Sequence, residues 1–175
     1  MIPFSVSVTL VMKSLIIVRH AKSSWYLSTP NDFDRTLNDR GKKDAPAAAK
    51  RLLKRGIAID AFISSPAVRA TKTAKYFIKE FGKDKSEIIF VPELYEAPTG
   101  VFFDVVKNLD DALNTVIIFA HNPGVTDFVN SLTEVKIDNV PTTGIFAVKA
   151  PVKSWEDFKT ATKEFWFFDY PKLNE

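Results

Sequence analysis

The chain has 175 residues, of which 46% are hydrophobic and 13% aromatic, so it is expected to form one globular domain and not to be disordered. The formal net charge is only +3, because 24 basic residues face 21 acidic ones, and without a long basic run nucleic acid is not an expected partner. Cysteine is absent, which excludes disulfides and thiol catalysis, and the two histidines are too few for a histidine-rich zinc site. We therefore expect no metal or cofactor, and the lack of cysteine fits a reducing cytoplasm.

Residues 1–11 form an apolar stretch that raises the question of a targeting signal. No basic region precedes this stretch, no small-residue cleavage site closes it, and it is too short to span a bilayer, so no membrane partner is expected. Met12 directly precedes the first predicted strand, and translation from either Met1 or Met12 fits the sequence. We interpret residues 1–11 as an N-terminal extension and residues 12–175 as a single domain.

The first predicted strand is the apolar run 15–18, whose β-branched content is typical of a buried strand. Arg19 and His20 follow at once, and a small polar loop comes next. In α/β sheets, ligands bind at the carboxyl ends of the strands. Arginine offers a fork of donors that suits phosphate, and histidine can act as a nucleophile or proton carrier, although this dipeptide alone is also typical of a structural histidine.

Helices and strands are predicted to alternate along the rest of the chain. Asn38 is the candidate N-cap of a first helix with an alanine- and leucine-rich face, and Gly56 is its candidate C-cap. Residues 60–65 predict a second strand. Ser65 is then expected to cap a second helix whose first residue is Pro66.

Arg69 lies in the first turn of this second helix, off its apolar face, so we expect it over the end of the preceding strand; a surface arginine is the other interpretation. Residues 87–91 predict a third strand, and Thr99 is a candidate cap for a third helix. The continuous apolar run 115–120 predicts a central strand covered on both faces, and it leads directly into His121.

The last predicted elements are a helix and two strands. Asn122 and Pro123 are expected as N-cap and first position of the helix, and residues 144–150 and 162–168 predict the strands. The alternation of strands and helices along the chain indicates a layered α/β fold.

The two histidines of the chain both follow apolar strands, so parallel pairing would bring His20 and His121 to one edge of the sheet. Arg19 and Arg69 are expected at the same edge. Two guanidinium groups and two imidazoles would form a compact pocket for a dianionic phosphate. One imidazole could attack phosphorus in line to form a phosphohistidine, while a nearby carboxylic acid protonates the leaving group and water then hydrolyses the intermediate.

Four motifs occur along the chain in a fixed order: Arg19-His20 after the first strand, DRTLNDRG at 34–41, SSPAVRATKTA at 64–74 and IFAHNP at 118–123. With these motifs the chain from Met12 onward resembles the histidine phosphatase superfamily, which has the phosphoglycerate mutase-like fold. Within that superfamily it is most similar to the SixA-type phosphohistidine phosphatases.

The resemblance implies a role for each residue that matches a family motif. His20 takes the position of the nucleophile, and Arg19 and Arg69 take those of the phosphate-binding arginines. His121 corresponds to the second histidine of the phosphate pocket. Ser23 occupies a loop position where the family often has a small hydroxyl residue that contacts phosphate.

The resemblance further implies a three-layer α/β/α domain with a mixed, mostly parallel sheet, and a metal-independent phosphatase that works through a phosphohistidine on His20. Little chain separates Glu96 from His121, which leaves little room for the lid of the related mutases, so hydrolysis of a phosphorylated protein is the favoured activity. A small-molecule phosphomonoesterase and a low-turnover phosphate-binding adaptor remain open alternatives. The sequence predicts no oligomeric state.

Two positions depart from the family pattern. Ala21 replaces the glycine of the Arg-His-Gly signature, and we expect its methyl group to alter the pocket slightly. The proton donor is assigned by the likeness of residues 94–96 to the Leu-x-Glu of the acid-bearing branches, which makes Glu96 the first candidate. Glu93 is the neighbouring alternative, and either glutamate could instead be a solvated loop carboxylate.

Overall fold

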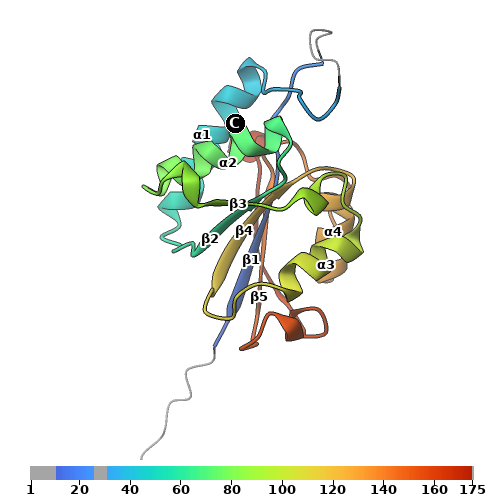
Figure 1. Cartoon of the computed structure of the whole chain (residues 1–175). Coiled ribbons are helices and arrows are strands. Elements are labelled where there is room, and N and C mark those ends of the chain that lie inside the picture. The colour runs from blue at the N-terminus through green and yellow to red at the C-terminus, as the bar shows by residue number, and fades with distance from the viewer. Residues whose placement is uncertain (1–10, 26–30, 175) are drawn as a thin grey trace, which may run out of the picture.

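The computed structural model describes residues 11–25 and 31–174, in which a sheet is covered by helices (Figure 1). The extension expected over residues 1–11 lies outside the described residues except for its last residue. The strands are β1 (Lys13–Arg19), β2 (Ala61–Ser64), β3 (Ile88–Phe90), β4 (Thr115–Ala120), β5 (Ile145–Ala150) and β6 (Glu164–Asp169). The α-helices are α1 (Asp39–Lys54), α2 (Val68–Glu80), α3 (Thr99–Lys107) and α4 (Gly124–Leu132). In this described part of the chain, no helix combines the length and apolarity needed to cross a membrane.

The strands form one sheet in the order β3-β2-β4-β1-β5-β6. The first four pair in parallel, β5 runs antiparallel to β1, and β6 runs antiparallel to β5. β6 therefore runs in the direction of β1. The carboxyl ends of β1, β2, β4 and β6 and the amino end of β5 consequently lie at one edge of the sheet. The predicted mixed, mostly parallel sheet is confirmed.

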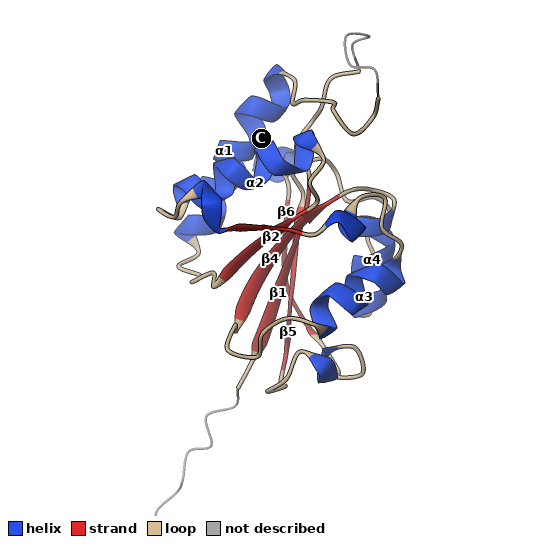
Figure 2. Ribbon diagram, in the orientation of Figure 1, coloured by secondary structure: helices blue, strands red, loops and turns tan. Residues whose placement is uncertain are grey.

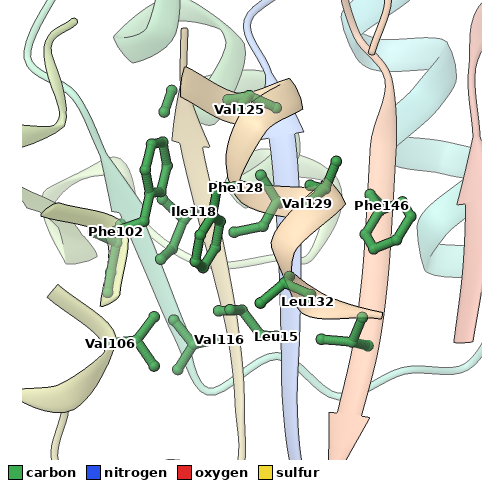
Figure 3. Packing of buried hydrophobic residues seen from close by; sticks show 14 of the residues in the cluster. Leu15, Phe102, Val106, Val116, Ile118, Val125, Phe128, Val129, Leu132 and Phe146 are labelled. Atoms are coloured by element: carbon green, nitrogen blue, oxygen red, sulfur yellow. The ribbon is translucent and has the colours of Figure 1, made fainter. Parts of the chain in front are cut away.

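Alternate residues of the central strands face two separate hydrophobic cores. In β1, Leu15 and Ile17 pack in the core formed with α3 and α4, whereas Ile16 and Val18 pack in the core formed with α1 and α2. Figure 2 shows the two helix pairs on opposite sides of the sheet, and Figure 3 shows side chains of α3 and α4 packed over β1 and β4. Because both faces of β1 and β4 are covered, the central residues of these strands, 15–18 and 116–120, are all apolar. The predicted three-layer α/β/α fold is confirmed.

The expected N-cap of α1 is present, whereas its C-cap is Arg55 and the expected Gly56 lies one residue further on. The Asn38 side chain accepts a hydrogen bond from the Gly41 N–H at 2.9 Å. At the other end Gly56 follows the C-cap residue with φ of 68°, in the left-handed region that glycine adopts at low cost.

The predicted start of α2 is wrong by two residues. The helix begins at Val68 and not at Pro66, and its N-cap residue Ala67 makes no side-chain cap. The hydroxyl group of Ser65, the expected cap, lies 2.8 Å from Nε2 of His121 and accepts a hydrogen bond from the Ala67 N–H at 3.3 Å. The Ser65 side chain, which the local sequence predicts as a helix cap, therefore contacts His121 at the end of a distant strand.

The starts of α3 and α4 also differ from the predictions. Thr99 is the first residue of α3, and the preceding proline occupies the N-cap position. α4 begins at Gly124, so Pro123 is the N-cap residue and not the first helical one. The Asn122 side chain still accepts a hydrogen bond from a backbone N–H in the first turn of α4, at 3.2 Å, so it satisfies this helix end from one residue further upstream.

Candidate active site

Two histidine side chains meet at the carboxyl edge of the sheet. His20 follows β1 and His121 follows the neighbouring parallel strand β4, so both leave the sheet in the same direction. Their ring centroids are 5.1 Å apart with an interplanar angle of 49°. Only 7% of His20 and 3% of His121 is exposed. The parallel strand pair thus brings together the two imidazoles that the sequence places at strand ends.

The two histidines line a pocket of about 290 Å³, which we call the histidine pocket. Its lining residues are Arg19, His20, Lys22, Ser23, Trp25, Asp32, Arg35, Arg69, Glu96, His121, Asn122 and Thr142. All six residues singled out from the sequence belong to this set. Glu93, the alternative carboxylate, lines a different cavity beside α3.

The hydrogen bonds of His20 define its protonation. Nδ1 lies 2.8 Å from the carbonyl oxygen of Ala21, which can only accept, so Nδ1 carries the proton. Nε2 accepts a hydrogen bond from Nε of Arg69 at 3.2 Å and therefore bears the lone pair. Burial, followed by the charges of neighbouring groups, lowers the pKa of His20 to about 3 despite its hydrogen bond to Ala21. At neutral pH His20 is an uncharged imidazole with Nε2 available as a nucleophile.

His121 complements this arrangement with a hydrogen-bond donor. Burial, and then the charge of Arg69, lowers its pKa to about 3. The Ser65 hydroxyl accepts a hydrogen bond from the Ala67 N–H and lies 2.8 Å from Nε2 of His121, to which it can donate its own proton. In the tautomer that suits this donation the ring proton is on Nδ1, which is buried and has no hydrogen-bond partner among the described residues. A buried N–H of this kind is suited to a phosphoryl oxygen.

Arg69 is held by a carboxylate that the sequence analysis did not single out. Its Nη2 donates to Oδ2 of Asp32 at 2.7 Å, and its Nη1 donates to the Asp32 carbonyl at 2.6 Å. Asp32 also accepts hydrogen bonds from Nη1 of Arg35 at 2.7 Å and from the Tyr95 hydroxyl at 2.9 Å. Burial raises the pKa of Asp32, but the hydrogen bonds from Arg35, Tyr95 and Arg69 together bring it well below its usual range. Asp32 therefore stays ionised and fixes the Arg69 guanidinium beside His20.

Arg19 and Ser23 reach the pocket from the two ends of the segment around His20. Nη1 of Arg19 donates to the Val140 carbonyl at 2.8 Å, while its buried Nε has no partner among the described residues. The Ser23 hydroxyl, 3% exposed, accepts a hydrogen bond from Nη2 of Arg35 at 2.7 Å. Arg19 thus keeps donor capacity for an anion, whereas the Ser23 hydroxyl is already engaged and can still donate its own proton.

One threonine connects the segment around His20 with helix α2. Oγ1 of Thr73 accepts a hydrogen bond from the Ala21 N–H at 2.9 Å and donates to the Arg69 carbonyl at 2.7 Å. Ala21 itself is fully buried, and its methyl group packs with Leu37 and Ala45 in a small apolar cluster. Ala21 does not line the histidine pocket. Contrary to our expectation, the added methyl group is directed into this cluster, so it does not narrow the pocket.

Two loop residues beside the histidine pocket have left-handed backbone conformations that residues other than glycine rarely adopt. Glu96, with φ of 51°, is exposed and lines the pocket. Thr143, with φ of 64°, is buried, and its N–H lies between the carbonyl oxygens of Arg19 and His20 at 3.0 and 3.2 Å. Such backbone strain costs about 1–3 kcal/mol and is concentrated at functional sites. The left-handed conformation at Glu96 accompanies a loop that lines the pocket, and the one at Thr143 accompanies hydrogen bonding of its N–H to the end of β1.

Comparison with known proteins identifies the family. The sequence profile of the histidine phosphatase superfamily (branch 1) matches residues 15–115, so the chain belongs to this superfamily. An uncharacterized protein of Mycobacterium leprae is 28% identical over 167 residues, which cover 89% of this chain and 100% of the relative. A 2,3-bisphosphoglycerate-dependent phosphoglycerate mutase of Bartonella tribocorum is 33% identical over 92 residues, 50% of this chain and 44% of the mutase.

Solved structures share the fold over most of this chain. The putative phosphohistidine phosphatase SixA of Agrobacterium tumefaciens has a TM-score of 0.75 at 23% identity, covering 91% of this chain and 98% of that one. The protein histidine phosphatase SixA complexed with tungstate has a TM-score of 0.78 at 20% identity, covering 93% and 99%. These neighbours show the fold, and membership of the superfamily supports a phosphatase or mutase-type activity.

Proposed function

We propose that this protein is a metal-independent phosphatase that transfers the phosphoryl group to Nε2 of His20, and that its substrate is phosphohistidine in a protein. The observation that supports the proposal most strongly is the tautomer of His20, with the proton on Nδ1 and the lone pair on the pocket nitrogen. The surrounding donors of Arg19, Arg69 and His121 match the three charged oxygens of a phosphoryl group.

In the first step the Nε2 lone pair of His20 attacks phosphorus, and the bond from phosphorus to the leaving oxygen or nitrogen breaks. The incoming phosphoryl group replaces the Arg69 Nε–H as the partner of Nε2. Arg69, Arg19 and the Nδ1–H of His121 take up the charge on the phosphoryl oxygens. Glu96, when protonated, gives its proton to the leaving group. A leaving imidazole departs more readily than an alkoxide and needs this proton less.

In the second step water attacks phosphorus, the phosphorus–nitrogen bond breaks, and its electron pair returns to Nε2 of His20. The Glu96 carboxylate accepts the proton lost by the water, which restores the starting state and releases inorganic phosphate. The exposed position of Glu96 allows it to exchange protons with solvent between turnovers.

A protein substrate needs an accessible pocket, and the segment between Glu96 and His121 supports such access. Between Glu96 and His121 the structure places helix α3 and strand β4, which belong to the core of the fold. In this stretch no additional segment is left to close over the pocket as a lid. The lack of a lid from this stretch would favour release of phosphate to water and access for a side chain on a protein surface.

The test is phosphate release from a phosphohistidine-bearing protein by wild type and by His20→Ala, with an aryl phosphate as the second substrate. The proposal predicts turnover by wild type on the phosphoprotein, none by the variant, and a radiolabelled phosphoryl group on wild type that is lost in acid. Faster turnover of the aryl phosphate would instead favour the small-molecule phosphomonoesterase. Phosphate binding without turnover of either substrate would contradict the enzyme proposal and favour the adaptor.

A further inference from the structure

A second cavity of about 320 Å³ adjoins the histidine pocket. Arg19, Lys22 and Thr142 line both cavities, so the two are direct neighbours at these residues. The second cavity is further lined by Arg40 from the first turn of α1 and by Lys172, which follows β6. We call this cavity the basic annex.

The topology of the sheet explains why these cations gather. The end of β6 and the start of β5 lie at the same edge as the end of β1, because β5 is antiparallel to both. Lys172, which follows β6, and Arg19, at the end of β1, therefore both line the annex. Arg40 comes from the amino end of α1, where the unpaired backbone N–H groups add a partial positive charge.

The charge of the annex is strongly one-sided. Four cationic side chains line it, those of Arg19, Lys22, Arg40 and Lys172, and no acidic residue lines it in the described part of the chain. The chain as a whole is nearly balanced, with 24 basic and 21 acidic residues, so this local excess is not a consequence of composition. Arg40 contacts Asp44 only through Nε, at 3.2 Å, so its terminal amino groups make no hydrogen bond to the described residues.

From these contacts we propose that the annex binds a second anionic group of the substrate, a carboxylate or a further phosphate, while the phosphoryl group occupies the histidine pocket. The inference rests on the proposed phosphatase function and specifies its substrate class. Arg19 and Lys22 stand between the two anions and neutralise both. Arginine terminal amino groups suit either anion, and an anion that reaches them together with Lys172 gains charge-assisted hydrogen bonds.

A binding experiment tests the proposal without requiring turnover. Alkylphosphonates occupy a phosphate pocket but contain a phosphorus–carbon bond, which the phosphatase reaction does not cleave. They are compared by calorimetry with phosphonocarboxylates and bisphosphonates of two to four linking carbons. The proposal predicts affinity about tenfold higher for probes with two anionic groups at one or more of these lengths. The probe series that gains indicates which second anion is bound, and the length that gains indicates its spacing from the phosphoryl group. Equal affinity at every length would overturn it.

Matched variants decide whether the annex causes the gain. Arg40→Gln combined with Lys172→Gln removes two annex cations and no residue of the catalytic pocket. Lys50→Gln combined with Lys54→Gln removes the same charge from exposed positions of α1 that line neither cavity. The first pair should abolish the tenfold gain and leave alkylphosphonate affinity unchanged, and the second pair should preserve the gain. A gain that survives the first pair, or is lost equally in both, would contradict the proposal.

Phosphohistidine peptides distinguish a protein source of the second anion from a small-molecule source. Peptides that differ only in Asp or Asn beside the phosphorylated residue are compared by kcat/KM. An Asp preference that disappears with Arg40→Gln/Lys172→Gln assigns the annex to acidic polypeptide, whereas a gain restricted to the phosphonocarboxylates or bisphosphonates assigns it to a small molecule. If no substrate turns over but the binding gain is present, the phosphatase proposal fails and the annex stands.

Discussion

Gly41 lies in the first turn of α1, where this helix packs against the loop that follows His20. A methyl group at this position would overlap the carbonyl oxygen of Lys22 and stand 3.0 Å from its carbonyl carbon and its nitrogen. All of these are backbone atoms, so no side-chain rotation relieves the overlap. The same carbonyl oxygen accepts a hydrogen bond from the Asn38 N–H at 3.0 Å. Gly41→Ala must therefore push the helix and the loop apart.

Two effects of opposite sign compete in Gly41→Ala. Helix propensity favours alanine over glycine by about 1 kcal/mol. Overpacking against rigid backbone costs about 3 kcal/mol, and weakening the bond from Asn38 to Lys22 costs about 1 kcal/mol. The steric effect is the larger, so we expect a net loss of about 3 kcal/mol, or roughly 6–12 °C in Tm for a domain of this size. Displacement of the loop that follows His20 should also lower kcat by about tenfold.

Gly100 in α3 provides the matched control, because a methyl group there meets no other atom within 4 Å. Gly100→Ala should therefore stabilise the protein, by up to about 1 kcal/mol. Urea unfolding followed by circular dichroism measures the free energy of unfolding of both variants and wild type. A Gly41→Ala protein that is as stable as wild type would refute the close approach of α1 to the loop.

Three further predictions concern the site. Ser65→Ala removes the hydroxyl partner of His121 and should lower kcat about tenfold, because the His121 ring can then carry its proton on Nε2. Ser65→Thr keeps a hydroxyl group and should recover kcat. Equal kcat in wild type and both variants would contradict this role of Ser65. The folded-state pKa values of both histidines, about 3, lie below the ordinary 6.5, so the unfolded chain binds more protons between these values. The free energy of unfolding should fall as pH drops from about 6.5 to 3. The double variant His20→Asn with His121→Asn should lose the part of this pH dependence that the two histidines cause. Glu96→Gln should reduce kcat at least about 100-fold on an aryl phosphate and less on phosphohistidine, and equal losses would exclude Glu96 as the proton donor.

The fold and the centre of the site could be predicted from local sequence. The runs 15–18 and 115–120 are apolar without alternation, which indicates strands covered on both faces, and a histidine follows each within two residues. Parallel strands in one sheet end at the same edge, so His20 and His121 are expected at one edge, and their contact follows because β1 and β4 are neighbours in the sheet. The positions of Arg19 and Arg69 follow by the same reasoning, because each lies at or just after a strand end.

The contacts that hold these residues could not be predicted, because they join segments far apart in the chain. Asp32 meets Arg69 and Tyr95 across 37 and 63 positions, and no sequence spacing encodes that reach. Ser65 shows the same limit, since its sequence predicts a helix cap and the folded chain gives its hydroxyl to His121.

The basic annex depends on tertiary structure alone. Its cations come from the end of β1, the loop after His20, the start of α1 and the segment after β6. Apart from Arg19, each has the appearance of an isolated surface charge in the sequence. Strand order and direction bring them to one place. The sequence by itself determined which elements form and which side chains leave the strand ends, since these depend on local hydrophobic pattern. Packing decided which distant polar groups meet, because that depends on how the layers are placed in space.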